Sequence, residues 1–287
     1  MASQILVSLD GALCDPDAPF LHADDLAAVR GDGIFETILV RSGRARCVGP
    51  HLERLAQSAA MLQLPAPDHE AWTLAIEIAT DAWVKAAGPD VEGLLRLVYS
   101  RGRESGDGGP TAYVTVSQVP DRVATARTDG VSVVTLERGY SIDLAARAPW
   151  QLLGAKTLSY AANMAALRYA AHEGFDDVIY VSSEGAVLEG PRSTVIAVFG
   201  DTMVTPPSEI GILPGTTQQA TFELAEREGW TVKSEVLERA DLIRADAVWL
   251  VSSVTLASRV TALNRFVMPV ADDLQRFPDL VDRAICV

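Results

Sequence analysis

Lys156 is the side chain best suited to covalent chemistry in this sequence. The chain has 287 residues and only two other lysines, Lys85 and Lys233. Lys156 follows the apolar residues 152–155 and precedes an alanine-rich stretch that favours a helix over residues 157–173. A lysine amine attacks a carbonyl group only when it is deprotonated, and burial or nearby positive charge favours that state. The sequence therefore predicts imine chemistry at Lys156, although an exposed lysine at a helix start would show the same pattern.

Two segments of the chain could bind a phosphate group. Residues 214–217 (PGTT) begin a predicted helix that ends at Gly229, and the first N–H groups of a helix bind anions. Arg54 lies in a predicted helix over residues 51–62, from which a guanidinium can make a bidentate contact. A helix cap at the threonines and a surface ion pair at Arg54 are the alternative interpretations.

Several other polar residues stand where they could take part in a reaction. Glu189 occurs in a turn-like Glu-Gly-Pro sequence, and Thr37 lies in a predicted strand over residues 34–40. Arg96 and Arg101 lie in or beside a second predicted strand and are candidates for binding a substrate carboxylate. A turn glutamate and a β-branched strand residue are the simpler interpretations of Glu189 and Thr37.

Hydrophobic periodicity predicts a mixture of helices and strands around these residues. Strands are predicted at residues 4–11, 34–40, 44–48, 94–100, 112–119, 131–136, 177–182, 193–199, 231–236 and 247–252. Helices are predicted at residues 51–62, 68–87 and 157–173, and from residue 216 to Gly229. Because strands and helices do not alternate strictly, we expect an α+β, or mixed α/β, fold.

A polar segment with turn residues at both ends, residues 120–130, is the predicted linker between two sub-domains. It divides the chain into an N-terminal α/β sub-domain, residues 1–119, and a C-terminal α/β sub-domain, residues 131–287. On this division the C-terminal sub-domain carries Lys156.

Charge and composition narrow the classes of function. The formal net charge of −14 disfavours nucleic acid as a partner. The three cysteines form no CxxC pair and the four histidines show no metal-ligand spacing, so we expect reduced thiols and no zinc site. The first residues lack a basic region and a sustained apolar run, and no stretch approaches the roughly 20 apolar residues of a membrane span. We expect a soluble, cytoplasmic protein that acts on a small molecule.

The order of motifs along the chain resembles that of the fold-type IV pyridoxal-phosphate enzymes. The series consists of GDGIFET (31–37), HLERL (51–55), GAKTLSY around Lys156, VLEGPRSTVIAVF around Glu189, ILPGTT (212–217) and VSSVT (251–255). This family includes branched-chain aminotransferases, D-amino-acid transaminases and aminodeoxychorismate lyases. The resemblance covers about residues 4 to 260. It implies a two-sub-domain fold with pyridoxal 5'-phosphate in the inter-domain cleft, and a homodimer.

The resemblance implies that three residues contact the reactive part of the cofactor, with Lys156 and Glu189 catalytic and Tyr160 cofactor-binding. Lys156 would hold the cofactor as a Schiff base and later move a proton. Tyr160, one predicted helical turn after Lys156, would contact the phenolic oxygen of the cofactor. Glu189 would pair with the pyridine nitrogen and keep it protonated. Ser159 and Thr194 stand where the family commonly has asparagine.

The same resemblance implies contacts to phosphate and substrate. The phosphate contacts would come from three parts of the chain, namely Arg54, Thr216 with Thr217, and Ser253. The YSRG sequence ending at residue 102 resembles the carboxylate-binding stretch of D-amino-acid transaminases, but no histidine follows it. Arg101 and Arg96 are therefore both candidates for holding the substrate carboxylate.

The N-terminal hairpin favours the lyase branch of this family. GDGIFET and the short IFETILVRSGR hairpin look closer to aminodeoxychorismate lyases than to branched-chain aminotransferases. The implied function is a 4-amino-4-deoxychorismate lyase that forms 4-aminobenzoate and pyruvate in folate biosynthesis, with Thr37 as general acid or hydroxyl donor. An aminotransferase for branched-chain or D-amino acids is the alternative. A third hypothesis is that the protein is a non-catalytic relative that binds the cofactor.

Overall fold

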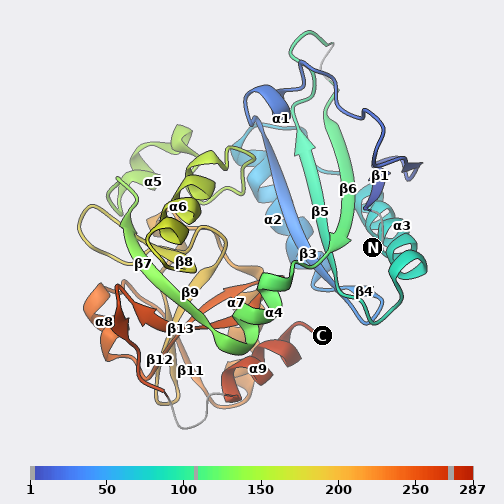
Figure 1. Ribbon diagram of the computed structural model, residues 1–287. Coiled ribbons are helices and arrows are strands. Elements are labelled where there is room, and N and C mark those ends of the chain that lie inside the picture. The colour runs from blue at the N-terminus through green and yellow to red at the C-terminus, as the bar shows by residue number, and fades with distance from the viewer. Residues whose placement is uncertain (1–3, 107–108, 271–274, 287) are drawn as a thin grey trace. The chain divides into compact units, whose positions relative to one another are not determined.

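The computed structural model describes residues 4–106, 109–270 and 275–286 (Figure 1). The chain divides into two compact units. The N-terminal unit comprises Met1–Pro120 and Ala155–Tyr160, and the C-terminal unit comprises Asp121–Gly154 and Ala161–Val287. Each unit combines helices with a β-sheet in no regular alternation, which confirms the expected mixed α/β class.

The described part of the N-terminal unit holds a six-stranded sheet in the order β2-β1-β6-β5-β3-β4. Its strands are β1 (Ile5–Ser8), β2 (Leu13–Cys14), β3 (Gly33–Arg41), β4 (Arg44–Ala45), β5 (Gly93–Ser100) and β6 (Thr111–Gln118). Its helices are α1 (Leu26–Val29), α2 (Val48–Met61) and α3 (His69–Ala87). Every pairing in this sheet is antiparallel. Along each strand, successive side chains point to opposite faces of the sheet.

Helices α2 and α3 bury the apolar side chains of this sheet. Ile38, Leu95 and Val116 lie at matching positions of β3, β5 and β6 and are all fully buried. Helix α3 adds Trp72 and Trp83, also fully buried. The intervening strand residues, which belong to the opposite face, include partly or fully exposed polar side chains. The polar side chains on that second face are the ones in this sheet that could contact a small molecule.

The described part of the C-terminal unit holds an eight-stranded mixed sheet in the order β11-β10-β9-β12-β13-β7-β8, with β14 paired to β13. The strands are β7 (Val131–Glu137), β8 (Asp177–Val181), β9 (Thr194–Phe199), β10 (Thr202–Thr205), β11 (Thr231–Ser234), β12 (Ala247–Ser252), β13 (Leu256–Leu263) and β14 (Phe266–Val267). The helices are α4 (Asp121–Asp129), α5 (Leu144–Arg147), α6 (Ala161–His172), α7 (Thr216–Arg227), α8 (Arg239–Arg244) and α9 (Arg276–Ala284), with 3-10 turns at Pro149–Gln151 and Ser208–Ile210.

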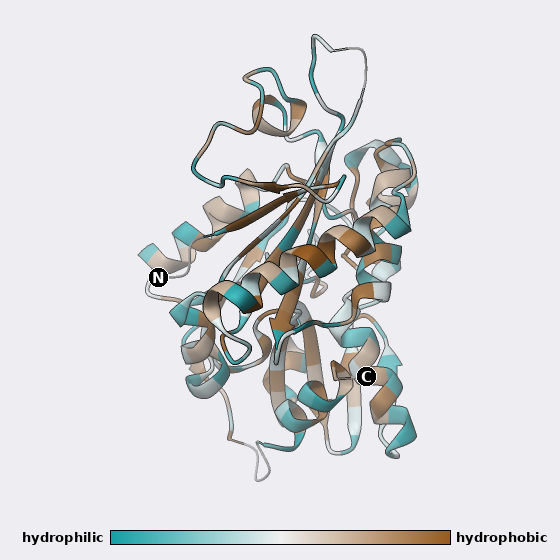
Figure 2. Cartoon of the chain, turned by 90° about the vertical axis from the view of Figure 1, so that its right-hand side faces the viewer, coloured by the Kyte–Doolittle hydropathy of each residue, from teal (hydrophilic) through white to brown (hydrophobic). Residues whose placement is uncertain are grey.

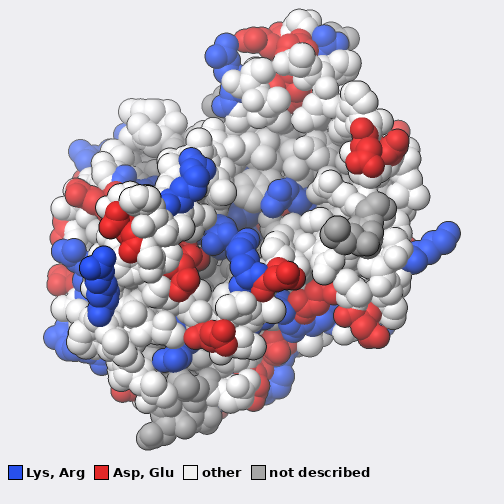
Figure 3. Space-filling model, viewed as in Figure 1, with Lys and Arg blue, Asp and Glu red and all other residues white. Residues whose placement is uncertain are grey.

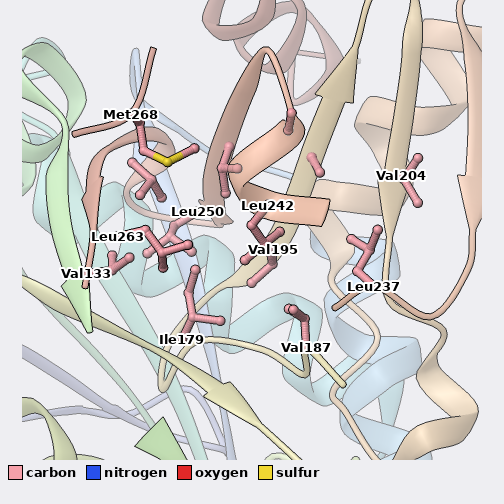
Figure 4. Close-up of a cluster of buried hydrophobic side chains, with 14 of the residues drawn as sticks. Val133, Ile179, Val187, Val195, Val204, Leu237, Leu242, Leu250, Leu263 and Met268 are labelled. Atoms are coloured by element: carbon pink, nitrogen blue, oxygen red, sulfur yellow. The ribbon is translucent and has the colours of Figure 1, made fainter. Parts of the chain in front are cut away.

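The core of the C-terminal unit lies on strands that are apolar along most of their length. Val133, Ile179, Val195 and Leu250 from four strands pack together with Leu242 of α8 (Figure 4). Figure 2 shows the same concentration of apolar residues on the strands, while the helices carry hydrophilic and hydrophobic residues side by side. Such strands are buried on both faces, which their nearly continuous apolar sequences predict.

Most of the predicted strands and helices are confirmed, with the following differences. The helix predicted from residue 157 begins at Ala161, because residues 156–158 are extended and bond to β3. Residues 120–130, the predicted linker, contain helix α4, and the two units divide between Pro120 and Asp121. The strand predicted at residues 44–48 ends at Ala45, and Val48 is already the first residue of α2. The prediction also did not include β2, β10, β13, β14, α1, α5 or α9.

Candidate active site

The backbone around Lys156 is attached to β3, which groups residues 155–160 with the N-terminal unit rather than with the C-terminal sub-domain that we expected. The N–H of Phe35 donates to Lys156 O at 3.0 Å, and the N–H of Leu158 donates to Gly33 O at 2.8 Å. The N–H of Lys156 donates to Ser58 Oγ of α2 at 3.2 Å. Strand β4 is only two residues long, so this edge of β3 is available for the pairing.

The GDG sequence before β3 makes this attachment possible. A Cβ at Gly33 would lie 2.7 Å from Leu158 Cδ1 and 2.8 Å from Tyr99 O, closer than real Cβ contacts allow. Gly31 has a φ of +67° and lies against Ser159, where a Cβ would be 2.8 Å from the Ser159 Oγ. The two glycines therefore allow the Lys156 segment to approach the strand closely.

The Lys156 side chain ends over an aromatic ring on the second face of the sheet. Its Nζ lies 4.7 Å from the centroid of the Phe35 ring, and the Tyr160 ring meets Phe35 edge-on at 5.5 Å. The guanidinium carbon of Arg96 lies 5.9 Å from the same centroid. Thr37, two residues beyond Phe35, is directly opposite Arg96 on β5. An amine, a phenol and an exposed cation thus lie around the Phe35 ring, and Thr37 is on the same face of β3.

Tyr160 reaches this position without the helical turn that we predicted between it and Lys156. That expectation was wrong, because residues 157–160 precede α6 and Thr157 forms a β-bridge with Ile34. The two side chains meet through Phe35 instead.

The Arg54 side chain holds a buried carboxylate, Glu36, on the covered face of β3. Arg54 Nε and Nη2 donate to Glu36 Oε1 and Oε2, each at 2.7 Å, and His51 Nδ1 lies 2.7 Å from Glu36 Oε2. Glu36 is fully buried, and Arg54 and His51 are 7% and 2% exposed. Sequence reasoning missed Glu36 and His51. Glu36 occupies an inward position between Ile34 and Ile38, and a carboxylate at such a position predicts a buried cationic partner.

The electrostatics of this cluster favour an ionised Glu36 and a neutral His51. Burial raises the pKa of Glu36, but the charge and hydrogen bonds of Arg54, together with His51, outweigh that effect and hold it below its usual range. Burial lowers the pKa of His51, against the attraction of Glu36. A neutral His51 can donate its Nδ1 proton to the carboxylate.

Arg101 is engaged in a structural contact. Its Nε donates to Asp32 Oδ2 at 2.7 Å, and its Nη2 donates to Leu62 O at 2.7 Å, at the C-terminal end of α2. Arg101 thereby ties the GDG turn to α2. Between the two candidates for a substrate carboxylate, Arg96 is the one that lies beside the ring contacted by Lys156.

Glu189 in the C-terminal unit is joined to the ILPGTT segment. Its Oε2 accepts a hydrogen bond from the N–H of Leu213 at 3.1 Å, and its backbone O accepts from the N–H of Tyr180 at 2.8 Å. Asn163 of α6 donates to Pro191 O at 3.2 Å, which holds the following turn. The Glu189 carboxylate is therefore bonded to the ILPGTT segment, while its backbone is bonded to β8.

A polar cluster beside Glu189 was not predicted from the sequence. Arg138 lies over the Tyr180 ring at 4.3 Å and donates from Nη1 to Asn163 Oδ1 at 2.5 Å. Burial and the negative charge of Glu189 raise the pKa of Tyr140 to about 12, so this phenol stays protonated. No local motif marks these residues, because β7, α6 and β8 bring them together.

Thr216, Thr217 and Ser253 converge at the N-terminus of α7. The two threonines are 3% and 4% exposed, and Thr216 Oγ1 lies 3.4 Å from Ser253 Oγ. Gly215 is the N-cap, and a Cβ there would lie 2.3 Å from Thr194 Oγ1, so the turn requires glycine. Hydroxyls beside the first N–H groups of a 12-residue helix form a suitable donor set for a phosphate dianion.

The described ranges contain no group of three or more His, Cys, Asp or Glu side chains that could hold a metal ion. None of the helices seen in those ranges is long and apolar enough to cross a membrane. On the face drawn in Figure 3, basic and acidic side chains are interspersed.

Comparisons with known proteins identify the family to which this chain is similar. The amino-transferase class IV family matches residues 33–263. A bifunctional aminodeoxychorismate lyase / D-amino acid transaminase of Mycobacterium tuberculosis is 54% identical over 288 residues, 98% of this chain and 99% of that protein. A solved structure of a hypothetical aminotransferase from M. tuberculosis in its PLP-bound form has a TM-score of 0.96 at 53% identity, with 99% of each chain covered. Its form bound to α-ketoglutarate and PMP has the same TM-score and identity, with 98% of each covered.

Proposed function

This chain belongs to the class IV aminotransferase family, and from that premise we propose that it is a pyridoxal-phosphate enzyme acting as a 4-amino-4-deoxychorismate lyase. The reaction forms 4-aminobenzoate and pyruvate, as required for folate biosynthesis. Transamination of D-amino acids is a second candidate activity, because the bifunctional relative is named for both reactions. Transamination of branched-chain amino acids rests on family membership alone.

The donor set of the described residues fits pyridoxal phosphate. The N-terminal unit supplies an amine for the aldehyde group and a phenol for the phenolic oxygen, namely Lys156 and Tyr160. The C-terminal unit supplies a carboxylate for the pyridine nitrogen and hydroxyls for the phosphate, namely Glu189, Thr216, Thr217 and Ser253. Arg54 is a further proposed phosphate contact, and its bonds to Glu36 hold the guanidinium in one orientation.

The observation that carries the proposal is the position of Lys156, whose backbone is bonded on both sides and whose amine lies over Phe35. Pyridoxal phosphate, when bound, supplies an electron-withdrawing ring that stabilises negative charge on the amine-bearing carbon of the substrate. Lys156 Nζ takes the proton from that carbon. Glu189, oriented by the N–H of Leu213, holds the pyridine proton by its charge.

Arg96 and Thr37 are the proposed substrate residues. Amino acids and aminodeoxychorismate all carry a carboxylate, and the exposed Arg96 guanidinium lies beside the same ring as the Lys156 amine. The Thr37 hydroxyl, opposite Arg96 in the sheet, would donate a proton to the departing enolpyruvate in the lyase reaction. A transaminase has no departing group at this position and would not depend on Thr37 in this way.

Product analysis of the purified protein with pyridoxal phosphate tests the proposal. We expect pyruvate and 4-aminobenzoate from aminodeoxychorismate, and D-glutamate from D-alanine with α-ketoglutarate. Neither product should form with Lys156→Ala. A fully loaded protein that yields D-glutamate but no 4-aminobenzoate is a transaminase only. A protein that yields neither product is an aminotransferase for branched-chain amino acids if it forms L-glutamate from L-leucine and α-ketoglutarate, and a non-catalytic relative if it does not.

We also propose that the protein is a homodimer. The C-terminal unit exposes several large apolar side chains, among them Trp150 (73%) on the 3-10 turn Pro149–Gln151, and Met164 (43%) and Tyr169 (52%) on α6. Apolar surface that is exposed in one chain can be buried when two chains associate. Sedimentation of a monomer at micromolar concentration with full activity would contradict this proposal.

A further inference from the structure

The connection between β12 and β13 carries Ser253 in a conformation that needs external support. The two strands pair up to Ser252 and Leu256, which leaves residues 253–255 as the turn. Leu256 is 3% exposed and has a φ of +63°, in the left-handed region. A branched side chain is disfavoured there, and glycine is the usual residue. Contacts from outside the turn must therefore hold it.

Arg127, at the C-terminal end of α4, supplies those contacts. Its Nη2 donates to Val254 O at 2.5 Å, and its Nε donates to Thr255 O at 3.3 Å. On the opposite side of the same peptide unit, the N–H of Thr255 donates to Ser252 Oγ at 3.2 Å. Because the C=O and N–H of a trans peptide point in opposite directions, this peptide is held at both ends.

Helix α4 is itself fixed to β13, so Arg127 is held in place. Ser258 Oγ donates to Ala126 O at 2.8 Å. At the end of the helix, Gly130 has a φ of +78°, and a Cβ there would lie 2.5 Å from Arg259 O. A cation in the last turn of a helix is also favoured by the helix dipole. The arginine is therefore part of a rigid support beneath the turn.

We propose that Arg127 is a positioning residue for phosphate binding. Its guanidinium donates hydrogen bonds to the Val254 and Thr255 carbonyls and so fixes the conformation of the turn. This conformation keeps Ser253 Oγ beside Thr216 Oγ1 at the N-terminus of α7. Its positive charge also favours a dianion at that hydroxyl pair. This inference rests on the proposed function, because it assumes that the hydroxyl pair binds the cofactor phosphate.

The test compares the affinities of the full-length apo protein for pyridoxal phosphate and for pyridoxal, measured by absorbance titration. The ratio of the two affinities reports on the phosphate contacts and not on the imine or the ring. Arg127→Met should lower this ratio by about tenfold or more, because it removes hydrogen bonds donated by a charged group. Arg127→Lys retains the charge but cannot bond both carbonyls with a planar fork, so the ratio should fall less. Arg239→Met, which removes an exposed arginine at the start of α8, is the matched control and should leave the ratio unchanged.

Ser253→Ala separates this inference from the function on which it rests. If Ser253→Ala and Thr216→Ala leave the ratio unchanged, the phosphate assignment itself is wrong. If they lower it while both Arg127 variants match the wild type, the positioning role of Arg127 is overturned. Should Arg127→Met fail to fold, Arg127→Lys decides, and an unchanged ratio in that variant contradicts the inference.

Discussion

Glu36→Gln should destabilise the protein strongly at neutral pH and much less in acid. The Glu36 carboxylate is fully buried and accepts hydrogen bonds at 2.7 Å from Arg54 Nε, Arg54 Nη2 and His51 Nδ1. Glutamine offers one acceptor and turns a donor toward the guanidinium, which leaves a buried cation without its counter-charge. Removing one partner of such a pair costs about 3–5 kcal/mol in the free energy of unfolding.

The pH dependence follows from the direction of the Glu36 pKa shift. Its pKa in the folded state is below the ordinary value of 4.5, so the unfolded chain takes up the proton first as pH falls. The stabilising effect is fully present above pH 4.5 and is lost progressively below it as the pH approaches the folded-state pKa. The difference between wild type and Glu36→Gln should therefore narrow below that pH.

Urea unfolding followed by circular dichroism at a series of pH values measures both effects. Glu104→Gln is the matched control, because Glu104 pairs with Arg30 at 3.6 Å in an exposed ion pair and should contribute little. A loss below about 1 kcal/mol at pH 7, or a loss that does not change with pH, would refute this account of the buried pair.

Three further substitutions test the proposed site. Glu189→Gln should keep cofactor affinity but lower kcat, because a neutral amide cannot hold the pyridine proton by charge; loss of affinity with unchanged kcat would contradict that role. Arg96→Met should raise the KM for amino acids about tenfold or more with a smaller effect on kcat, and an unchanged KM in steady-state assays would exclude Arg96 as the carboxylate partner. Gly33→Ala places a Cβ 2.8 Å from Tyr99 O, so the Lys156 segment should shift; unchanged thermal stability and an unchanged imine absorbance would show that the close approach is unnecessary.

Much of the secondary structure, and the family, could be predicted from the sequence alone. Strand β6 shows apolar residues at alternate positions, β3 and β5 contain short apolar runs, and α2 and α3 show apolar residues at helical spacing, so local patterns were sufficient. Lys156 could be selected as the candidate for imine chemistry because that chemistry requires a lysine, and because only three lysines occur in the chain. The order of motifs around it also identified the family correctly.

Only the tertiary structure decided which polar groups contact one another across distant parts of the chain. The sequence of residues 156–158 is compatible with a helix. These residues are extended instead, because their backbone groups form hydrogen bonds with the edge of β3. Glu36 and Arg54 lie 18 positions apart, and Arg127 and Val254 lie 127 apart. Hydrophobic periodicity indicates which face of an element is buried. It does not indicate which polar group from another element will compensate a buried charge or carbonyl, because that partner is selected by packing between distant parts of the chain.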